Sequence, residues 1–295
     1  MKSTLTGLAK LTRINEFGYF ILITTLLGVA EAGGVFDQRL VLVMLANGLA
    51  VSFAYMVNDI EDAPEDAFST KNKQRNPISS GLISTKTARL AALVCGLVAA
   101  GVYVLLGWWT FTFGMACLLL GIVYSHKAIR LKTVALLDMI SRGLLQAGLP
   151  FLCAYFAFNG TLNRTWMWPF LFMILLSIFN DLHDARRTDE AERQARQDRL
   201  AALLGERSAA IMMTAVVILL GSTGIVSFFL INLVPAWVKV TISALFLLFF
   251  VPPYIKFRRS ETQESLRVLL FNTLERAAAI GLCFQYLIPW LVQIF

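Results

Sequence analysis

Residues 40–66 read LVLVMLANGLAVSFAYMVNDIEDAPED, an apolar run that ends in a cluster of acidic side chains. Residues 40–57 carry no charge and, at about 1.5 Å per helical residue, are long enough to cross a hydrocarbon core of about 30 Å. Asn58, Asp62 and Asp66 then recur every four residues, so a helix aligns their oxygen atoms along one face. We therefore predict a transmembrane helix with a polar, oxygen-rich end.

The rest of the chain has the same apolar character. Hydrophobic residues make up 57% and charged residues only 15% of the 295 residues, and the mean hydropathy is +0.68, too apolar for a soluble domain of this size. We expect an all-α integral membrane protein, a single domain over residues 1–295. Apolar windows predict about nine transmembrane helices, near residues 14–31, 40–58, 87–107, 109–124, 134–157, 166–181, 209–231, 235–254 and 270–293.

The basic residues indicate the orientation of these helices. With a cytoplasmic N-terminus, nearly all of the 26 Lys and Arg residues fall in cytoplasmic segments, and only Arg39, Arg164 and Lys239 lie at the opposite ends of spans. This bias predicts a multi-pass protein of the cytoplasmic (inner) membrane. It also accounts for the net charge of +7 without a nucleic-acid partner; anionic membrane lipid is the expected contact. The long charged loops are cytoplasmic, so we expect the active site on that face.

A second polar cluster follows the sixth predicted span. Residues 180–184 read Asn-Asp-Leu-His-Asp, with Asp189 beyond them, and repeat the Asn-Asp-x-x-Asp pattern of residues 58–62. The repeat suggests two related halves with motifs at 58–66 and 180–189. Carboxylates at a membrane boundary are costly to desolvate unless they meet cations, and Mg²⁺ prefers carboxylate, amide and phosphate oxygens. Paired clusters therefore fit a magnesium-bridged diphosphate; the alternative is ordinary solvated carboxylates at helix ends.

Basic segments on the same face could bind the phosphate oxygens. Residues 71–81 contribute Lys73 and Arg75, and residues 124–132 contribute Tyr124, Lys127, Arg130 and Lys132. The alternative is that these Lys and Arg residues only set the orientation of the helices in the membrane.

Asp138 and Arg142 lie four residues apart, early in the fifth predicted span. We favour a structural ion pair over a role near the diphosphate or the acceptor.

These motifs resemble those of the UbiA superfamily of intramembrane aromatic prenyltransferases. Asn58-Asp59-x-x-Asp62-x-x-x-Asp66 is similar to the first Asp-rich motif of that family, and residues 75–81 resemble its Arg-Pro-Ile-x-Ser-Gly turn with one residue inserted. Arg13 resembles a basic residue of the family's first helix. The resemblance implies helices around a central lipid-open cavity, with two Mg²⁺ ions held by the two motifs: Asn58, Asp62 and Asp66, and Asn180, Asp181 and Asp184. Asp59 and Asp189 are further candidates.

The second motif departs from the family pattern, which is usually Asp-x-x-x-Asp. Here the pair four residues apart is Asn180 and Asp184, whereas Asp181 and Asp184 are three apart. The ligands of the second Mg²⁺ therefore stay open.

The resemblance also implies an activity: Mg²⁺-dependent transfer of a prenyl group from a polyprenyl (allylic) diphosphate to a hydrophobic or aromatic acceptor, with release of pyrophosphate. The catalytic carboxylates would be Asp62, Asp66, Asp181 and Asp184, and the diphosphate ligands Arg13, Lys73, Arg75, Tyr124, Lys127, Arg130 and Lys132. One alternative is a UbiA-type terpene cyclase or a non-catalytic lipid-binding protein. Another is an ion-coupled transporter, which is less favoured because transporter sites tend to lie near the midplane.

Overall fold

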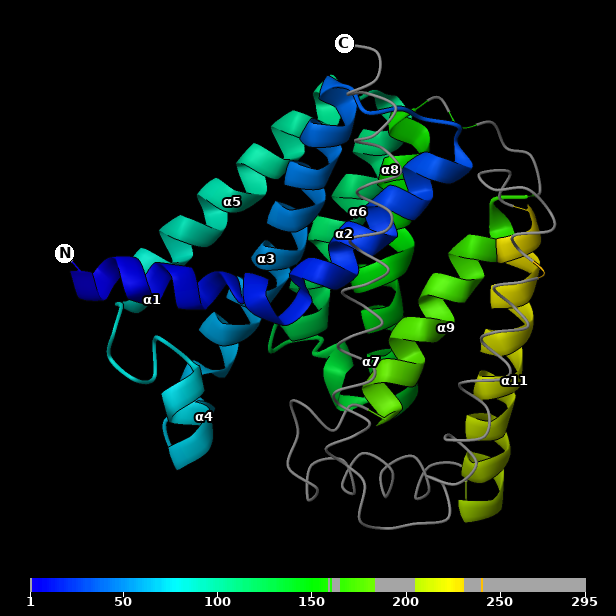
Figure 1. The fold of residues 1–295 in the computed structure, drawn as a ribbon. Coiled ribbons are helices and arrows are strands. Elements are labelled where there is room, and N and C mark those ends of the chain that lie inside the picture. The colour runs from blue at the N-terminus through cyan, green and yellow to red at the C-terminus, as the bar shows by residue number, and fades with distance from the viewer. Residues whose placement is uncertain (1, 159, 161–164, 184–204, 231–239, 241–295) are drawn as a thin grey trace.

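The computed structural model describes residues 2–158, 160, 165–183, 205–230 and 240, and every regular element among them is helical (Figure 1). The elements are α1 (Lys2–Thr12), α2 (Ile14–Glu31), α3 (Gln38–Asp66), α4 (Thr70–Arg75), α5 (Thr85–Leu105), α6 (Trp108–Ser125), η1 (Leu131–Thr133), α7 (Ala135–Gly143), η2 (Leu144–Gly148), α8 (Leu149–Ala157), α9 (Met167–His183) and α11 (Glu206–Leu230).

Five of these helical runs are long and apolar enough to cross a membrane: α2, α3, α5, α6 and the continuous run α7–η2–α8 (Ala135–Ala157). The apolar parts of α9 and α11, Met167–Phe179 and Thr214–Ser227, are shorter. Each of the first seven predicted spans thus coincides with a helix. The last two, at 235–254 and 270–293, lie outside the described residues, so the number nine stays a prediction.

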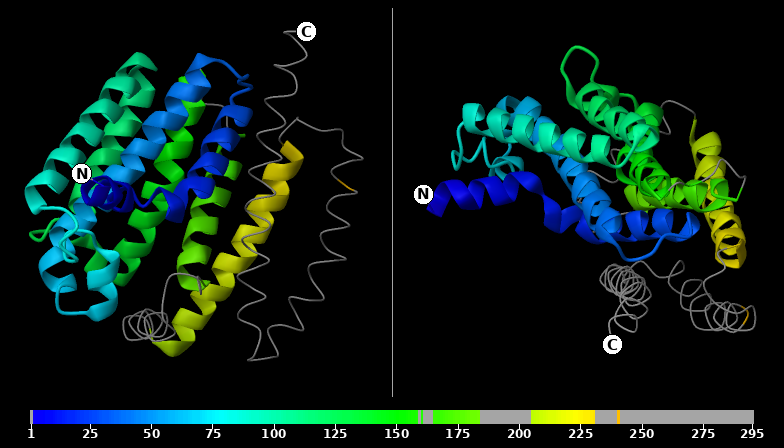
Figure 2. Two further views of the ribbon diagram at one scale, coloured as in Figure 1. Left: turned by 60° about the vertical axis from the view of Figure 1, so that its left-hand side comes forward. Right: turned by 90° about the horizontal axis from the view of Figure 1, so that it is seen from above.

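Helix α3 is the central element, packed between α2, α5, α6 and α8 (Figures 1 and 2). Its buried face is rich in small residues, including Ala46, Ala50 and Ala54. A Cβ placed on Gly121 of α6 would lie 2.9 Å from the Cβ of Ala54, so glycine is required at this crossing. Small residues let membrane helices approach closely, which maximises dispersion contacts where no water is available to drive association.

A buried hydrogen-bond network fixes α3 within the bundle. The Asn47 side chain, fully buried, donates to Thr25 Oγ1 and to the carbonyl oxygen of Pro150, each at 2.9 Å. Its Oδ1 accepts a hydrogen bond from the Tyr103 hydroxyl at 2.9 Å. Four helices are therefore joined at one amide, whose polar atoms would otherwise be costly in an apolar interior.

The last turns of α3 project beyond its apolar run. A proline removes a backbone hydrogen bond and often kinks or ends a helix, but Pro64 lies inside α3, which continues to Asp66. Side chains of the following loop bond the carbonyl groups near this proline: Asn76 Nδ2 donates to Asp59 O at 2.8 Å, and Ser79 Oγ to Ala63 O at 2.7 Å. The loop thus holds the end of α3 in place.

Candidate active site

The polar end of α3 faces a basic segment that joins α6 to α7. In this segment the Lys132 ammonium lies 2.5 Å from Asp62 Oδ2 and 3.0 Å from Asn58 Oδ1. Arg130 Nη2 lies 3.3 Å from Asp62 Oδ1 and 2.5 Å from Glu65 Oε2. Charges from two regions about 70 residues apart in sequence therefore meet at Asp62.

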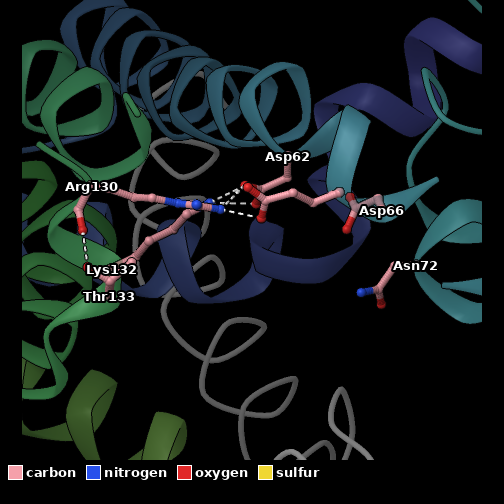
Figure 3. A pocket seen from close by; sticks show the side chains of 7 residues that line it. Asp62, Asp66, Asn72, Arg130, Lys132 and Thr133 are labelled. Carbon is pink, nitrogen blue, oxygen red and sulfur yellow. Dashed lines mark hydrogen bonds and ion pairs between the residues drawn. The ribbon is translucent and has the colours of Figure 1, made fainter. Parts of the chain in front are cut away.

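Asp62, Glu65, Arg130 and Lys132 line a cavity of about 360 Å³. Figure 3 shows Arg130 and Lys132 reaching toward Asp62 from one side, with Asp66 and Asn72 on the other. Among the described residues, the lining consists of Asp62, Glu65, Asp66, Asn72, Arg130, Lys132 and Thr133. Carboxylates and cations thus share one concave space, which suits an anion bound together with a metal ion.

The backbone of Arg130 adopts a left-handed conformation (φ 49°), which is uncommon for residues other than glycine and costs conformational energy. This turn directs both Arg130 and Lys132 toward α3. The hydrogen bond to Glu65 raises the pKa of Arg130, against the opposing effect of burial. The guanidinium is therefore a permanent cation at the cavity.

Arg13, a predicted diphosphate ligand, is placed elsewhere. It forms a bidentate ion pair with Asp59, in which Nε lies 3.2 Å from Oδ2 and Nη2 contacts Oδ1. The Asp59 side chain is fully buried and that of Arg13 is 9% exposed. The guanidinium also lies over the Tyr55 ring, 5.5 Å from its centroid. Neither charged residue lines the cavity, so this pair joins the α1–α2 junction to α3.

Three other predicted basic ligands, Lys73, Arg75 and Lys127, are not among the described residues that line the cavity. Arg75 forms an ion pair with Glu16 at 2.7 Å, and Lys73 and Lys127 are exposed. Among the described cavity-lining residues, the basic ones are Arg130 and Lys132. The structure thus brings two of the predicted diphosphate ligands to the first motif, and roles for the others stay predictions.

Tyr124 belongs to a separate cluster. Its hydroxyl donates to Asp138 Oδ1 at 2.6 Å and accepts from Arg142 Nε at 2.8 Å, and Arg142 also bonds Asp138 at 2.8 Å. The structure contains the ion pair between Asp138 and Arg142, with Tyr124 as its third member, and its structural role stays a prediction. It fixes the end of α6 against α7.

The second motif is described only in part. Asn180 and Asp181 lie in the last turn of α9, whose end lies on the same side of the bundle as the end of α3 (Figure 1). Asp184 and Asp189 lie outside the described residues. Within the described ranges, no group of three His, Cys, Asp or Glu side chains forms a metal site. Asp62, Asp66 and Asn58 could supply oxygen ligands to one Mg²⁺, and the motif at 180–189 stays a prediction.

Sequence reasoning missed four cavity or supporting residues. Glu65, Asn72 and Thr133 line the cavity, and Asn76 bonds the Asp66 carboxylate at 2.9 Å. Glu65 lies within the first motif but off the four-residue spacing, so helical periodicity did not select it. Asn76 is a polar residue directly before a proline in a turn, a signal that could have drawn attention to it.

This chain is similar to several known proteins. A curated relative, 4-hydroxybenzoate octaprenyltransferase of Blochmanniella pennsylvanica, is 30% identical over 179 residues. The match spans 59% of this chain and 60% of that protein, less than two thirds of the relative's length.

Two solved structures share the fold. A UbiA homolog from Archaeoglobus fulgidus, bound to GPP and Mg²⁺, has a TM-score of 0.63 at 16% identity, over 94% of this chain and 99% of that chain. A digeranylgeranylglyceryl phosphate synthase has a TM-score of 0.69 at 16% identity, over 96% and 97% of the two chains. At such identities the likeness concerns the fold alone.

The family model described as the UbiA prenyltransferase family matches residues 21–274. This range holds the apolar helices, the motif at the end of α3 and the basic segment that faces it. The family resemblance of the sequence motifs is therefore confirmed: the chain belongs to the UbiA prenyltransferase family.

Proposed function

We propose that this protein transfers a prenyl group from an allylic polyprenyl diphosphate to a hydrophobic or aromatic acceptor and releases pyrophosphate, with Mg²⁺ as its cofactor. The observation that carries the proposal is the cavity at the end of α3, where carboxylates and cations face each other. The curated relative is named an octaprenyltransferase for 4-hydroxybenzoate, and one structural neighbour was bound to GPP and Mg²⁺.

The donor chemistry of the cavity fits a metal. Asp62 and Asp66 offer carboxylate oxygens, and Asn58 an amide oxygen, on one face of α3; this is the ligand set that Mg²⁺ prefers. The Asp62 carboxylate already stabilises a cation, the Lys132 ammonium at 2.5 Å. When bound, Mg²⁺ would neutralise the charge that develops on the departing pyrophosphate. We propose that oxygen atoms from the second motif, with Asn180, Asp181 and Asp184 as the candidates, complete the site.

Arg130 and Lys132 would donate hydrogen bonds to the diphosphate oxygens, because both cationic groups line the cavity. In the reaction, the allylic carbon–oxygen bond breaks and its electron pair stays on the pyrophosphate oxygen. The acceptor supplies the electron pair of the new bond to the allylic carbon, and the proton that it held at the attacked atom passes to the pyrophosphate or to water. These two cations are thus placed to stabilise the leaving group in the transition state.

The membrane arrangement supports the same proposal. The cavity lies where α3 leaves its apolar run, so a polar diphosphate would bind outside the hydrocarbon region while its prenyl chain reaches between the helices. We propose that this end lies on the cytoplasmic side of a multi-pass protein of the cytoplasmic membrane, which the distribution of Lys and Arg supports.

The test is an incubation of purified, detergent-solubilised protein with Mg²⁺, prenyl diphosphates of several lengths, and either 4-hydroxybenzoate or a lipid extract. Pyrophosphate release and mass-shifted products are measured, with Asp62→Ala as the matched control. Release with a prenylated acceptor, absent from the control, supports the transferase. Release with only hydrocarbon or alcohol products would indicate a cyclase or hydrolase, and no release at any length would refute the proposal.

A further inference from the structure

Asn76 is fully buried, and both the nitrogen and the oxygen of its side-chain amide form hydrogen bonds. Its Nδ2 donates to the backbone carbonyl of Asp59 at 2.8 Å and to Asp66 Oδ2 at 2.9 Å. Its Oδ1 accepts hydrogen bonds from the backbone N–H groups of Ile78 at 2.9 Å and Ser79 at 3.4 Å. One side chain therefore connects the loop after α4 to two successive turns at the end of α3.

The end of α3 depends on such a connection. Pro64 has no N–H, so the helix loses the backbone hydrogen bond that would join residue 64 to the carbonyl of Ile60. Asp66 lies two residues beyond this break, at the last position of the helix. Asn76 bridges this break, because its amide links the carbonyl of Asp59, before the break, with the carboxylate of Asp66, after it.

Asp66 is also a lining residue of the cavity, together with Asp62. The hydrogen bond from Asn76 to Oδ2 restricts the rotation of this carboxylate. We propose that Asn76 is a positioning residue for Asp66, which it holds in the orientation that binds the divalent cation. The inference rests on the proposed function, since it needs the metal site at the end of α3.

The sequence around Asn76 fits this assignment. Asn76 stands between Arg75 and Pro77. It is the one residue inserted relative to the Arg-Pro-Ile-x-Ser-Gly turn that residues 75–81 resemble. In this chain Arg75 instead pairs with Glu16 at 2.7 Å. This turn contacts Asp66 through the side-chain amide of Asn76.

The experiment is a titration of the purified protein with Mn²⁺, in which electron paramagnetic resonance measures free Mn²⁺ and no substrate is present. Asn76→Ala should weaken Mn²⁺ binding by about ten- to a hundredfold, the usual effect of removing a partner that orients a metal ligand. Ser79→Ala is the matched control, because Ser79 bonds α3 at Ala63 O from the same loop. It should keep wild-type affinity.

A double variant separates positioning from loop stability. If Asn76 acts through Asp66, Asn76→Ala should have no further effect on Mn²⁺ affinity in an Asp66→Ala background. Equal losses of affinity in Asn76→Ala and Ser79→Ala would overturn the inference, as would wild-type affinity in Asn76→Ala. If the wild-type protein itself fails to bind Mn²⁺, the metal site of the proposed function falls, and this inference falls with it.

A second measurement needs no variant and applies even if Asn76→Ala does not fold. Because Asn76 Oδ1 accepts from Ile78 and Ser79 N–H, cation binding at Asp66 should stabilise the loop by linkage. Hydrogen–deuterium exchange of these two amides should slow severalfold when Mn²⁺ is added to the wild-type protein. Unchanged exchange at a saturating Mn²⁺ concentration would refute the coupling.

Discussion

Asp59→Ala should cost this protein stability, in contrast to the neighbouring carboxylates that line the cavity. The Asp59 side chain is fully buried and its partner Arg13 is 9% exposed. With Arg13 Nε and Asp59 Oδ2 3.2 Å apart, the charges attract by about 5 kcal/mol at an effective dielectric constant of ~20. Removing one partner of a buried pair leaves an uncompensated charge, so we expect a loss of about 3–5 kcal/mol.

The assay is reversible unfolding in detergent micelles, followed by circular dichroism, for wild type, Asp59→Ala and Asp62→Ala. The side chains of Asp62 and Lys132 are 19% and 13% exposed, so their ion pair keeps more contact with solvent, and removal of Asp62 should lower the unfolding free energy by less than removal of Asp59. The double variant Arg13→Met/Asp59→Leu removes both charges and should regain most of the stability lost in Asp59→Ala.

The result that would refute this reasoning is equally specific. If Asp59→Ala unfolds like the wild type but loses its turnover, the carboxylate acts on the substrate or the metal, as the family motif alone allows. The assignment of Asp59 and Arg13 to a structural ion pair would then be wrong.

Four further predictions concern the cavity and its surroundings. Asp62→Ala or Asp66→Ala should lower turnover by at least about 10³-fold, since each removes a carboxylate ligand of the Mg²⁺ that would neutralise the leaving group, while membrane insertion, measured by fractionation, is unchanged; wild-type turnover would contradict the metal assignment. Lys132→Met should lower kcat/KM for the diphosphate by about 10–100-fold, the loss of a charge-assisted hydrogen bond, in steady-state kinetics; an unchanged value would exclude Lys132 as a ligand. Asp138→Ala should destabilise the fold by about 1–3 kcal/mol, because it leaves Arg142 and Tyr124 without their shared acceptor, yet keep turnover per folded molecule within a few-fold. Chelation by EDTA should abolish turnover and added Mg²⁺ restore it; activity that survives chelation would refute the cofactor proposal.

Much of the helical architecture could be predicted from the sequence. The first seven predicted spans coincide with helices of the structure, from α2 to α11. Apolar length and helical periodicity are local properties of the chain, so a window of some twenty residues contains the signal. The common face of Asn58, Asp62 and Asp66 follows for the same reason, because their spacing matches the helical repeat and Pro64 does not end the helix before Asp66.

The partners of the charged residues could not be predicted in this way. Arg13, Arg75, Arg130 and Lys132 look alike in the sequence, yet the first two pair with Asp59 and Glu16, and the last two face the cavity beside Asp62. Each pair joins residues more than forty positions apart, so no local pattern specifies it.

The sequence by itself therefore determined that this is a membrane protein, with a polar helix end of the family type. The tertiary structure alone decided which cations and amides meet that helix end, including the hydrogen bond of Asn76 to Asp66. The physical reason is that helices form from neighbouring residues, whereas hydrogen bonds and ion pairs between them depend on distances that only packing sets.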